Sequence, residues 1–363
     1  MTLQRLRLGS RRSPMAIAQS GDVARLITER TGRPVEIVGI TSFGDVSKAA
    51  LTQIGGTGVF VSNLRESLLR GEVDLAVHSL KDLPTASPEG ITLAAVPERD
   101  DPRDALVGRD GAKLADLPRG ARIGTGSPRR AAQIALLRAD VTCVAIRGNA
   151  NTRLAKVRDG ELDAVVLACA GLARIGLTEL VTQVFETEDM VPAPGQGALA
   201  VECRMGDAEV TGLLATIDHP ATRIAVTAER SLLAGLEAGC SAPVGGYATV
   251  SAATPAGRPK VRLAGVVLGM PHPGGVDVSA GSEMMVVREH GEADATNPAG
   301  LGRELARQML ASGAGRLIAA PGSAARSSAA ESSAAKGSAA KDSAVTDGST
   351  AGTATTNRED VHD

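Results

Sequence analysis

The chain has 363 residues, a length that suggests two or three domains. Hydrophobic residues make up 43% and charged residues 22%, as in a soluble globular enzyme, and the formal net charge of −2 gives no overall basic field to attract nucleic acid. Aromatic residues are only 1% and Trp is absent, so platforms for stacking nucleobases are scarce. We therefore expect no nucleic-acid partner.

The first two-thirds of the chain alternate between strand-like and helix-like segments. Strands are expected at LRLGS (6–10), PVEIVGITS (34–42) and VDLAVHSL (73–80), and helices at 13–32 and 59–72. This alternation predicts βα units around largely parallel sheets.

The pattern then restarts. RLGSRRSPMAIAQSG (7–21) resembles RIGTGSPRRAAQIAL (122–136), and GEVDLAVHS (71–79) resembles GELDAVVLA (160–168). We predict two lobes of related architecture, although a chance likeness between strand–turn–helix segments is the alternative. Lobe 1 is expected at 1–98 and 196–217, and lobe 2 at 99–195.

Two polar segments rich in Pro or Gly are expected to cross between the lobes, PERDDPRDAL (97–106) and VPAPGQGALAVEC (191–203). The apolar ALAVEC of the second crossing predicts a strand that rejoins the sheet of lobe 1. Two crossings would make a hinged cleft, a common place for ligands.

The chain changes character near residue 220. Helical segments flank three strand-like ones, YATVSA, KVRLAGVVLG and EMMVVREH, which predicts a third, α+β domain over 218–320. Residues 321–363 are rich in Ala, Ser, Gly and Thr. Such a tail buries too little apolar surface to offset the entropy of ordering, so we predict disorder.

Four cysteines are present, and none has a Cys or His partner at metal-ligand spacing, so no metal is expected. Cys143 and Cys169 fall in apolar, strand-like runs, and Cys203 lies in LAVECRM; all three are interpreted as buried small hydrophobic residues. Cys240 differs, because it lies among Gly, Ala, Ser and Pro. The chain has no apolar run of membrane-spanning or signal length, so we expect a cytoplasmic protein without a membrane partner.

Arginines gather in turns beside strand ends. At a helix start they oppose the helix dipole, so their presence there favours an anionic ligand held by guanidinium forks. For any single arginine, a solvated basic surface is the alternative. The residues are Arg11 and Arg12, Arg129 and Arg130 at the repeated turns, and Arg147, Arg153 and Arg174 in two further segments.

A second polar cluster follows the strand of VHSLKDLPT (77–85). Ser79, Lys81 and Asp82 come where the strand ends, and strand ends face the ligand crevice in open α/β sheets. Asp82 is interpreted as a carboxylate buried against a cationic centre, with an ordinary exposed ion pair as the alternative. The loop GGTGVF (55–60) lacks the P-loop ending. It is either a mobile lid with Phe60 anchoring the next helix or a simple connection.

The segments VHSLKDLPT, GTGSPRRAAQ, IRGNANTRL, PAPGQGALAVECR and LEAGCSAPVG occur in this order. Together they resemble the hydroxymethylbilane synthase family, also called the porphobilinogen deaminases, over about residues 5–320. The resemblance implies two periplasmic-binding-protein-like α/β lobes with a hinge and double crossover, plus a C-terminal α+β domain. It also implies a transferase of porphyrin biosynthesis that joins four porphobilinogen molecules head to tail, releasing ammonia and then 1-hydroxymethylbilane.

The same resemblance implies roles for individual residues. Cys240 would carry a dipyrromethane cofactor through a thioether. Asp82, with Lys81, would be catalytic. The cofactor would be bound by Ser79, Lys81, Ser127, Arg129, Arg130 and Arg147, and the substrate by Arg11, Gln19, Phe60, Arg153 and Arg174. Every pyrrole ring carries an acetate and a propionate, which gives the arginines a reason.

The chain departs from the family at Gln53 and Thr57, where some members have lysines in the glycine-rich loop. This puts loop contacts with substrate in doubt. Two other readings remain, a two-lobed receptor for a small anion and a nucleic-acid binder that uses the basic turns. The first leaves Cys240 and the third domain unexplained, and net charge opposes the second. A monomer is expected on family grounds.

Overall fold

A computed structural model describes residues 4–40, 58–239, 242–252, 257–269 and 285–318. The predictions for Gln53, Thr57, Cys240 and the tail 321–363 lie outside them. The helix that contains Phe60 is described, but the side chain of Phe60 is not.

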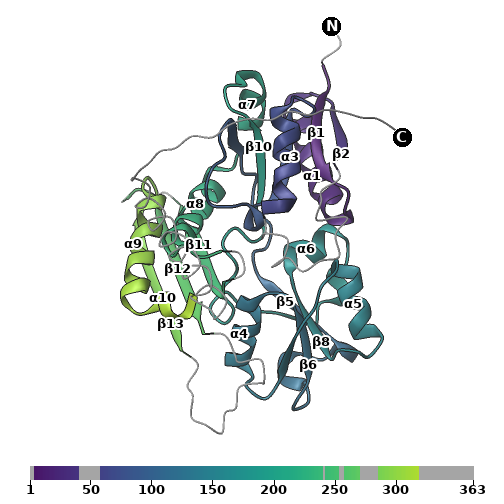
Figure 1. Cartoon of the computed structure of the whole chain (residues 1–363), viewed down its shortest axis with the longest axis vertical. Coiled ribbons are helices and arrows are strands. Elements are labelled where there is room, and N and C mark those ends of the chain that lie inside the picture. Colours follow the sequence, from purple (N-terminus) through teal and green to yellow (C-terminus); the bar gives the residue numbers. More distant parts are fainter. Residues whose placement is uncertain (1–3, 41–57, 240–241, 253–256, 270–284, 319–363) are drawn as a thin grey trace, which may run out of the picture. The chain divides into compact units, whose positions relative to one another are not determined.

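Lobe 1 is built on a five-stranded sheet with the order β2-β1-β3-β10-β4. Its strands are β1 (Leu6–Arg11), β2 (Val35–Ile40), β3 (Leu75–Ser79), β4 (Ile91–Ala95) and β10 (Leu199–Arg204), and its helices are α1 (Pro14–Thr31), α3 (Gly58–Leu69) and α7 (Ala208–Ala215). Strands β1, β2 and β10 of this sheet are labelled in Figure 1. Strand β1 pairs in parallel with β2 and β3, whereas β10 runs antiparallel to β3 and β4.

Lobe 2 repeats this arrangement with the order β7-β6-β8-β5-β9. Its strands are β5 (Asp104–Gly108), β6 (Arg122–Thr125), β7 (Thr142–Ala145), β8 (Ala164–Ala168) and β9 (Gln183–Val184), and its helices are α4 (Pro128–Leu137), α5 (Ala150–Arg158) and α6 (Cys169–Arg174). Strand β6 pairs in parallel with β7 and β8, and β5 runs antiparallel to β8. The two predicted lobes and their related architecture are therefore confirmed.

The double crossover adds one feature that the sequence did not predict. Most strands of each sheet run in one direction, as predicted, but each sheet also receives one reversed strand that enters by the crossing segment, β10 in lobe 1 and β5 in lobe 2. The predicted return of ALAVEC to the first sheet is confirmed by β10, which lies between β3 and β4. The exact domain limits stay a prediction.

The repeated turns show why helices begin where they do. Ser13 caps α1 by accepting a hydrogen bond from Ala16 N at 3.3 Å, and Ser127 caps α4 by accepting one from Arg130 N at 3.4 Å. A proline occupies the first helical position in both cases, where its missing N–H costs nothing. The arginine pairs are not equivalent, however. Arg11 ends β1 before its cap, whereas Arg129 and Arg130 lie in the first turn of α4.

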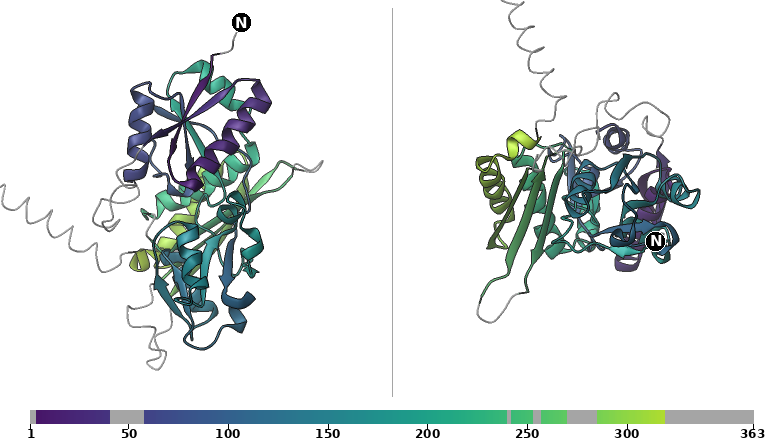
Figure 2. Two further views of the ribbon diagram at one scale, coloured as in Figure 1. Left: turned by 90° about the vertical axis from the view of Figure 1, so that its right-hand side faces the viewer. Right: turned by 90° about the horizontal axis from the view of Figure 1, so that it is seen from below.

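Each lobe buries both faces of its sheet. In lobe 1, helices α1 and α7 cover the face of Leu75 and Val77, and α3 covers the face of Ala76 (Figure 2, left view). In lobe 2, α4 covers the face of Val166, and α5 and α6 cover that of Val165. This alternation of buried side chains along one strand is what a central strand requires.

The third domain places helices on a meander of three antiparallel strands. The strands are β11 (Val244–Val250), β12 (Lys260–Leu268) and β13 (Val286–Asp294), and the helices are α8 (Pro220–Gly235), α9 (Pro298–Ala311) and α10 (Ala314–Ile318). One sheet face packs on α8 and α9. The opposite face packs Val266 and Leu268 against Val191 and against Ala132 of α4. The predicted α+β domain is confirmed.

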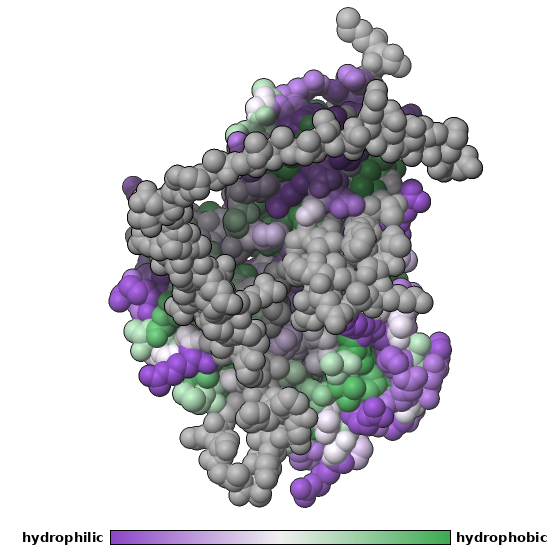
Figure 3. Space-filling model, in the orientation of Figure 1, coloured by the Kyte–Doolittle hydropathy of each residue, from purple (hydrophilic) through white to green (hydrophobic). Residues whose placement is uncertain are grey.

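The exposed large hydrophobic residues of the described chain are spread over several elements, among them Leu69 of α3, the adjacent Leu136 and Leu137 of α4, and Leu310 of α9. On the face drawn in Figure 3, hydrophobic side chains stand in small groups between hydrophilic ones. Within the part of the chain that the structure describes, no helix has the length and apolar character needed to span a membrane. The monomeric state stays a prediction.

Candidate functional site

Polar side chains from both lobes lie at the strand ends, as the sequence predicts. Ser79 ends β3, and its hydroxyl accepts a hydrogen bond of 2.7 Å from Gln19 Nε2 of α1. A 3-10 helix follows at once over Leu80–Asp82. In lobe 2, Ser127 and the two arginines of α4 come directly after β6.

Two further polar residues reach the same edges by a different route. Because β5 and β10 run antiparallel to their neighbours, they begin where the parallel strands end. Asp104 opens β5 opposite Ala168, the last residue of β8, and Gln196 lies three residues before β10. Gly195 and Gly197 hold Gln196 in place with φ of +76° and +88°, a conformation that L side chains rarely adopt.

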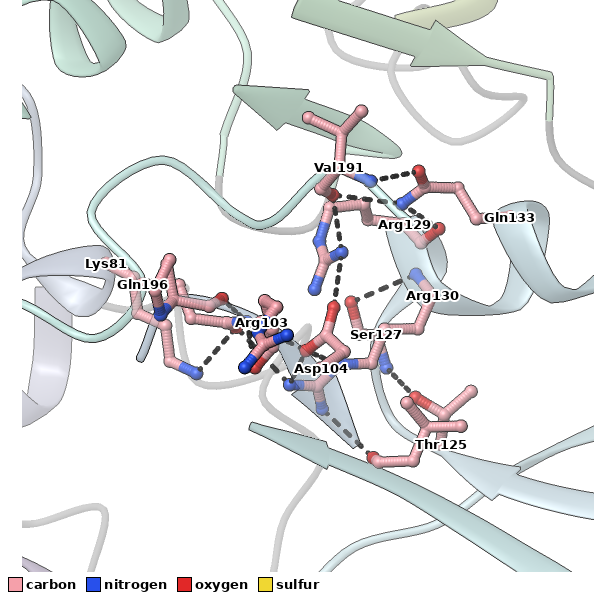
Figure 4. A network of polar contacts seen from close by, with 12 residues as sticks. Lys81, Arg103, Asp104, Thr125, Ser127, Arg129, Arg130, Gln133, Val191 and Gln196 are labelled. Carbon is pink, nitrogen blue, oxygen red and sulfur yellow. Dashed lines mark hydrogen bonds and ion pairs between the residues drawn. The ribbon is translucent and has the colours of Figure 1, made fainter. Parts of the chain in front are cut away.

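Asp104 is the centre of a buried ionic network (Figure 4). It is fully buried, and it pairs with Arg129 Nη1 through Oδ2 at 2.8 Å and with Arg130 Nη2 through Oδ1 at 2.7 Å. Arg129 Nη1 also donates to Val191 O at 2.7 Å, and Arg130 Nη1 donates to Val166 O at 3.1 Å. Both guanidinium groups are therefore oriented from several directions.

Gln196 links this network to lobe 1. Its amide nitrogen donates to Asp104 Oδ1 at 2.8 Å. Its amide oxygen accepts from Lys81 Nζ at 3.4 Å and from Arg130 Nη2 at 3.3 Å. Lys81 and Arg130 thus share the side-chain amide oxygen of Gln196.

The network around Asp104, together with Lys81 and Arg153, carries more positive than negative charge, and the pKa values of its members reflect this excess. Burial, followed by the charge of Arg130, lowers the pKa of Lys81 to about 8, even though Asp82 and Asp104 raise it. Burial and Arg130 also lower the pKa of Arg153. Burial opposes ionisation of Asp104, but the two arginines of α4 outweigh it and lower its pKa. An anionic ligand would relieve this imbalance.

The remaining predicted arginines lie in different surroundings. Arg153 of α5 is partly buried and donates to Gly148 O at 2.9 Å, whereas Arg147 is exposed. Arg174 of α6 pairs with Asp100 and donates to Gly197 O at 2.9 Å, so it holds both crossing segments. Arg11 is half-buried at the end of β1.

The prediction that Asp82 is buried is wrong for the structure described. Asp82 ends the 3-10 helix Leu80–Asp82 as an exposed residue. The short helix turns the chain outward directly after β3, so Lys81, rather than Asp82, is directed into the network. Asp82 still acts on the site through charge, because it raises the pKa of Lys81.

The three described cysteines are poor nucleophiles. Burial raises the pKa of the Cys143 thiol to about 11 and of the Cys169 thiol to about 12, and it also raises that of Cys203. Cys169 is buried but opens α6 rather than lying in a strand, and Cys143 lies in β7 but is only half-buried, which corrects those two expectations. Gly239 and Ala242, on either side of the undescribed pair that includes Cys240, are joined by a hydrogen bond of 3.0 Å from Ala242 N to Gly239 O.

These raised pKa values predict slow alkylation. At pH 7.5, N-ethylmaleimide should leave Cys143, Cys169 and Cys203 of the folded protein unmodified while reacting with all free thiols after denaturation, because thiolates are the reactive form. Peptide mass spectrometry would locate the labels. Labelling of these three cysteines in the folded protein at the rate of the denatured protein would contradict this assignment.

A cavity of about 180 Å³ lies elsewhere, between α8 and the β4 region of lobe 1. Its two arginines, Arg223 and Arg230, donate to backbone carbonyl groups of residues 83–85, 93 and 94. The cavity contains none of the predicted site residues, and both of its arginines have backbone partners.

Sequence reasoning missed the junction at which the third domain meets both crossing segments. Glu229 of α8 is fully buried and accepts two hydrogen bonds from Arg99, of 2.6 and 3.1 Å. It also accepts from Gly195 N at 2.6 Å and Ala248 N at 2.8 Å. The signal was a glutamate on the apolar stripe of an amphipathic helix, a position where burial requires partners.

The fold and the site define a two-lobed α/β protein with a buried arginine cluster suited to an anionic ligand. Two family models match the chain, the porphobilinogen deaminase dipyromethane cofactor binding domain over residues 6–212 and the porphobilinogen deaminase C-terminal domain over residues 223–311. The chain belongs to the porphobilinogen deaminase family, whose members are enzymes, the hydroxymethylbilane synthases.

Two curated relatives align with this chain over nearly the whole of their own length. Porphobilinogen deaminase from Thermobifida fusca is 58% identical over 316 residues, which are 86% of this chain and 95% of that protein. Porphobilinogen deaminase 1 from Streptomyces coelicolor is 56% identical over 324 residues, 88% of this chain and 98% of that protein. A solved periplasmic substrate-binding protein of an ABC transporter from Coxiella burnetii aligns at 15% identity and a TM-score of 0.37, over 60% of this chain and 94% of that one; we draw no conclusion from so low a score.

Proposed function

We propose that this chain is a hydroxymethylbilane synthase that joins four porphobilinogen molecules head to tail and releases 1-hydroxymethylbilane and ammonia. The observation that carries the proposal is the cluster of Lys81, Arg129, Arg130 and Arg153 at the strand ends, in which the pKa values of Lys81, Arg129 and Arg153 are lowered by burial and by neighbouring positive charge. A growing chain of rings that each carry two carboxylates matches this excess of cations.

The family's dipyrromethane cofactor fits the residues present. Buried Nε atoms of Arg129 and Arg174 have no hydrogen-bond partner among the described residues, which is costly unless a ligand completes them. We propose that Ser79, Lys81, Ser127, Arg129, Arg130 and Arg147 hold the cofactor, and that the Cys240 sulfur tethers it. When bound, the cofactor supplies the pyrrole carbon to which the first substrate is joined.

The residues of this chain have distinct tasks in the proposed mechanism. Asp82 assists the loss of ammonia from porphobilinogen and stabilises the positive charge that develops on the pyrrole nitrogen. Lys81 and Arg129 bind carboxylates, with the fixed fork of Arg129 orienting the reacting ring, and Arg130 attracts carboxylates through its fixed positive charge. Arg11, Gln19, Arg153 and Arg174 extend this binding surface to the incoming substrate, and Phe60 is proposed to border it.

Two further proposals concern the protein as a whole. We propose that it acts in the cytoplasm as a monomer. The scattered positions of the exposed hydrophobic residues support the monomer. The rival reading, a receptor that binds a small anion without catalysis, predicts no covalent group and no consumption of porphobilinogen.

Intact-protein mass spectrometry tests the proposal. The purified active protein should exceed its sequence mass by one dipyrromethane, and Cys240→Ser should remove the increment and the activity, because a serine hydroxyl is a far weaker nucleophile than a thiolate. Cys203→Ser is the matched control, since that thiol is buried in β10. It should keep both. An active protein of unmodified mass would overturn the assignment of Cys240.

A further inference from the structure

We propose that Asp104 is a positioning residue for the reaction, which fixes the forks of Arg129 and Arg130 and, with Gln196, sets the charge around Lys81. This inference deepens the proposed function and rests on it. Asp104 is not among the residues that the family resemblance suggests for ligand binding. Its proposed role follows instead from its position at the start of β5, where the first crossing segment enters lobe 2.

The contacts of Arg129 show how Asp104 acts. Asp104 Oδ2 and Val191 O both bind Nη1 of this guanidinium. The adjacent edge, formed by Nε and Nη2, takes part in neither contact, and Nε has no partner among the described residues. A carboxylate binds that edge side-on with two parallel hydrogen bonds. Asp104 therefore binds the Nη1 end of the Arg129 guanidinium and leaves the edge formed by Nε and Nη2 for a ligand.

The contacts of Arg130 are different. Its Nε donates to Asp104 at 2.9 Å, its Nη2 pairs with Asp104 and Gln196, and its Nη1 donates to Val166 O. Protein groups thus engage all three nitrogen atoms. Asp104 fixes Arg130 in place, so the positive charge of Arg130 acts from one defined position beside Lys81.

A carboxylate at this position has a cost for a site that binds anions. It cancels one positive charge and so weakens attraction for the ligand. Without it, two buried guanidinium groups would lie side by side with no counter-ion, and each would disfavour the charge of the other. The attraction is weaker, but Arg129 is held with an open edge and the charge of Arg130 is held in one position.

Among the described residues, the charges with the largest effect on Lys81 belong to three elements. Asp82 follows it in the 3-10 helix, Asp104 opens β5, and Arg129 and Arg130 belong to α4, with the neutral Gln196 between them. Both aspartates raise the pKa of Lys81 and both arginines lower it. Loss of the Asp104 charge removes a raising contribution, so the pKa of Lys81 must fall below its present value of about 8.

The test uses the full chain and three variants. Asp104→Asn removes the charge and keeps the shape. Asp104→Asn/Gln196→Glu moves the carboxylate to the neighbour that already contacts Lys81 and Arg130. Glu202→Gln is the control, because Glu202 is also a buried carboxylate with two partners, Arg65 and His78, but is not one of the charges that chiefly set the pKa of Lys81.

Two measurements separate positioning from stability. The first is the fraction of protein that carries the dipyrromethane mass after incubation with porphobilinogen. The second is the pKa of Lys81 in unloaded protein, followed by NMR of ¹³C-methylated lysines; the chain has seven lysines, and Lys81→Arg assigns the signal. Asp104→Asn should lower the pKa of Lys81 by about one unit and the loaded fraction about tenfold.

The double variant should return the pKa of Lys81 toward the wild-type value and recover part of the loading, and Glu202→Gln should leave this pKa unchanged. Folded Asp104→Asn with wild-type pKa and loading would overturn the proposal. If Asp104→Asn does not fold, the double variant decides: restored loading supports the proposal, and a folded double variant without loading contradicts it. Should wild-type protein neither load nor consume porphobilinogen, the proposed function fails, while the pKa of Lys81 still tests Asp104.

Discussion

Replacement of Asp82 by asparagine is expected to reduce turnover of porphobilinogen by about 10² to 10⁴-fold while the protein stays folded. Asparagine keeps the size of the side chain but can neither hold a proton for transfer nor balance a positive pyrrole nitrogen. Asp82 is exposed at the end of a 3-10 helix, so its replacement should change the free energy of unfolding by less than about 0.5 kcal/mol. Release of ammonia and formation of the linear tetrapyrrole would report the rate.

Asp110→Asn is a matched control for this experiment. Asp110 is likewise an exposed aspartate in a short 3-10 helix, Arg109–Gly111, and asparagine tolerates its positive φ of 54°. It is in lobe 2 and makes none of the contacts of the arginine network. The control should retain full turnover. If Asp82→Asn also turned over at nearly the wild-type rate, Asp82 would have no catalytic role.

Replacement of Glu229 by glutamine should lower the free energy of unfolding by about 3 to 5 kcal/mol. The glutamine has one acceptor oxygen for the four donors that the carboxylate now satisfies, and the Arg99 side chain, only 10% exposed, would keep its charge without a counter-ion. Chemical denaturation of the full chain measures the effect, provided that one transition is seen.

Glu304→Gln is the control for Glu229→Gln, because it removes an exposed ion pair instead of a buried one. Glu304 and Arg307 form a pair on α9 whose side chains are 48% and 70% exposed. Such surface pairs contribute little, so this variant should lose less than about 1 kcal/mol. Equal losses for Glu229→Gln and Glu304→Gln would show that the junction with Arg99 does not stabilise the fold.

The sequence was informative about the fold because local signals repeat. Ser-Pro pairs mark the starts of α1 and α4, and apolar runs flanked by Gly or Pro mark β3, β8 and β10. Strand direction was harder to predict, since an apolar run looks the same in either direction. Only the chain path through the crossing segments decides that β5 and β10 are reversed.

The same reversal explains which site residues were missed. Ligand-facing positions were sought at the carboxyl ends of strands, which yields Ser79 and Lys81 but not Asp104. In a reversed strand the first residue, not the last, reaches that edge. Asp104 and Gln196 lie in segments that read as simple crossings, and their partners are far away in the sequence. The exposure of Asp82 depended on a three-residue helix that no pattern marks.

The position of β10 in the sheet also affects how the chain folds while it is being synthesised. Among the described strands, β4 is hydrogen-bonded in the sheet only to β10, yet roughly a hundred residues separate them, which means a delay of about 5 to 20 s during synthesis. All strands of lobe 2 emerge within that interval. The second lobe can therefore complete its sheet while the first still has an unfilled gap beside β3, so a nascent chain stalled before residue 199 exposes that strand edge to other chains and to chaperones.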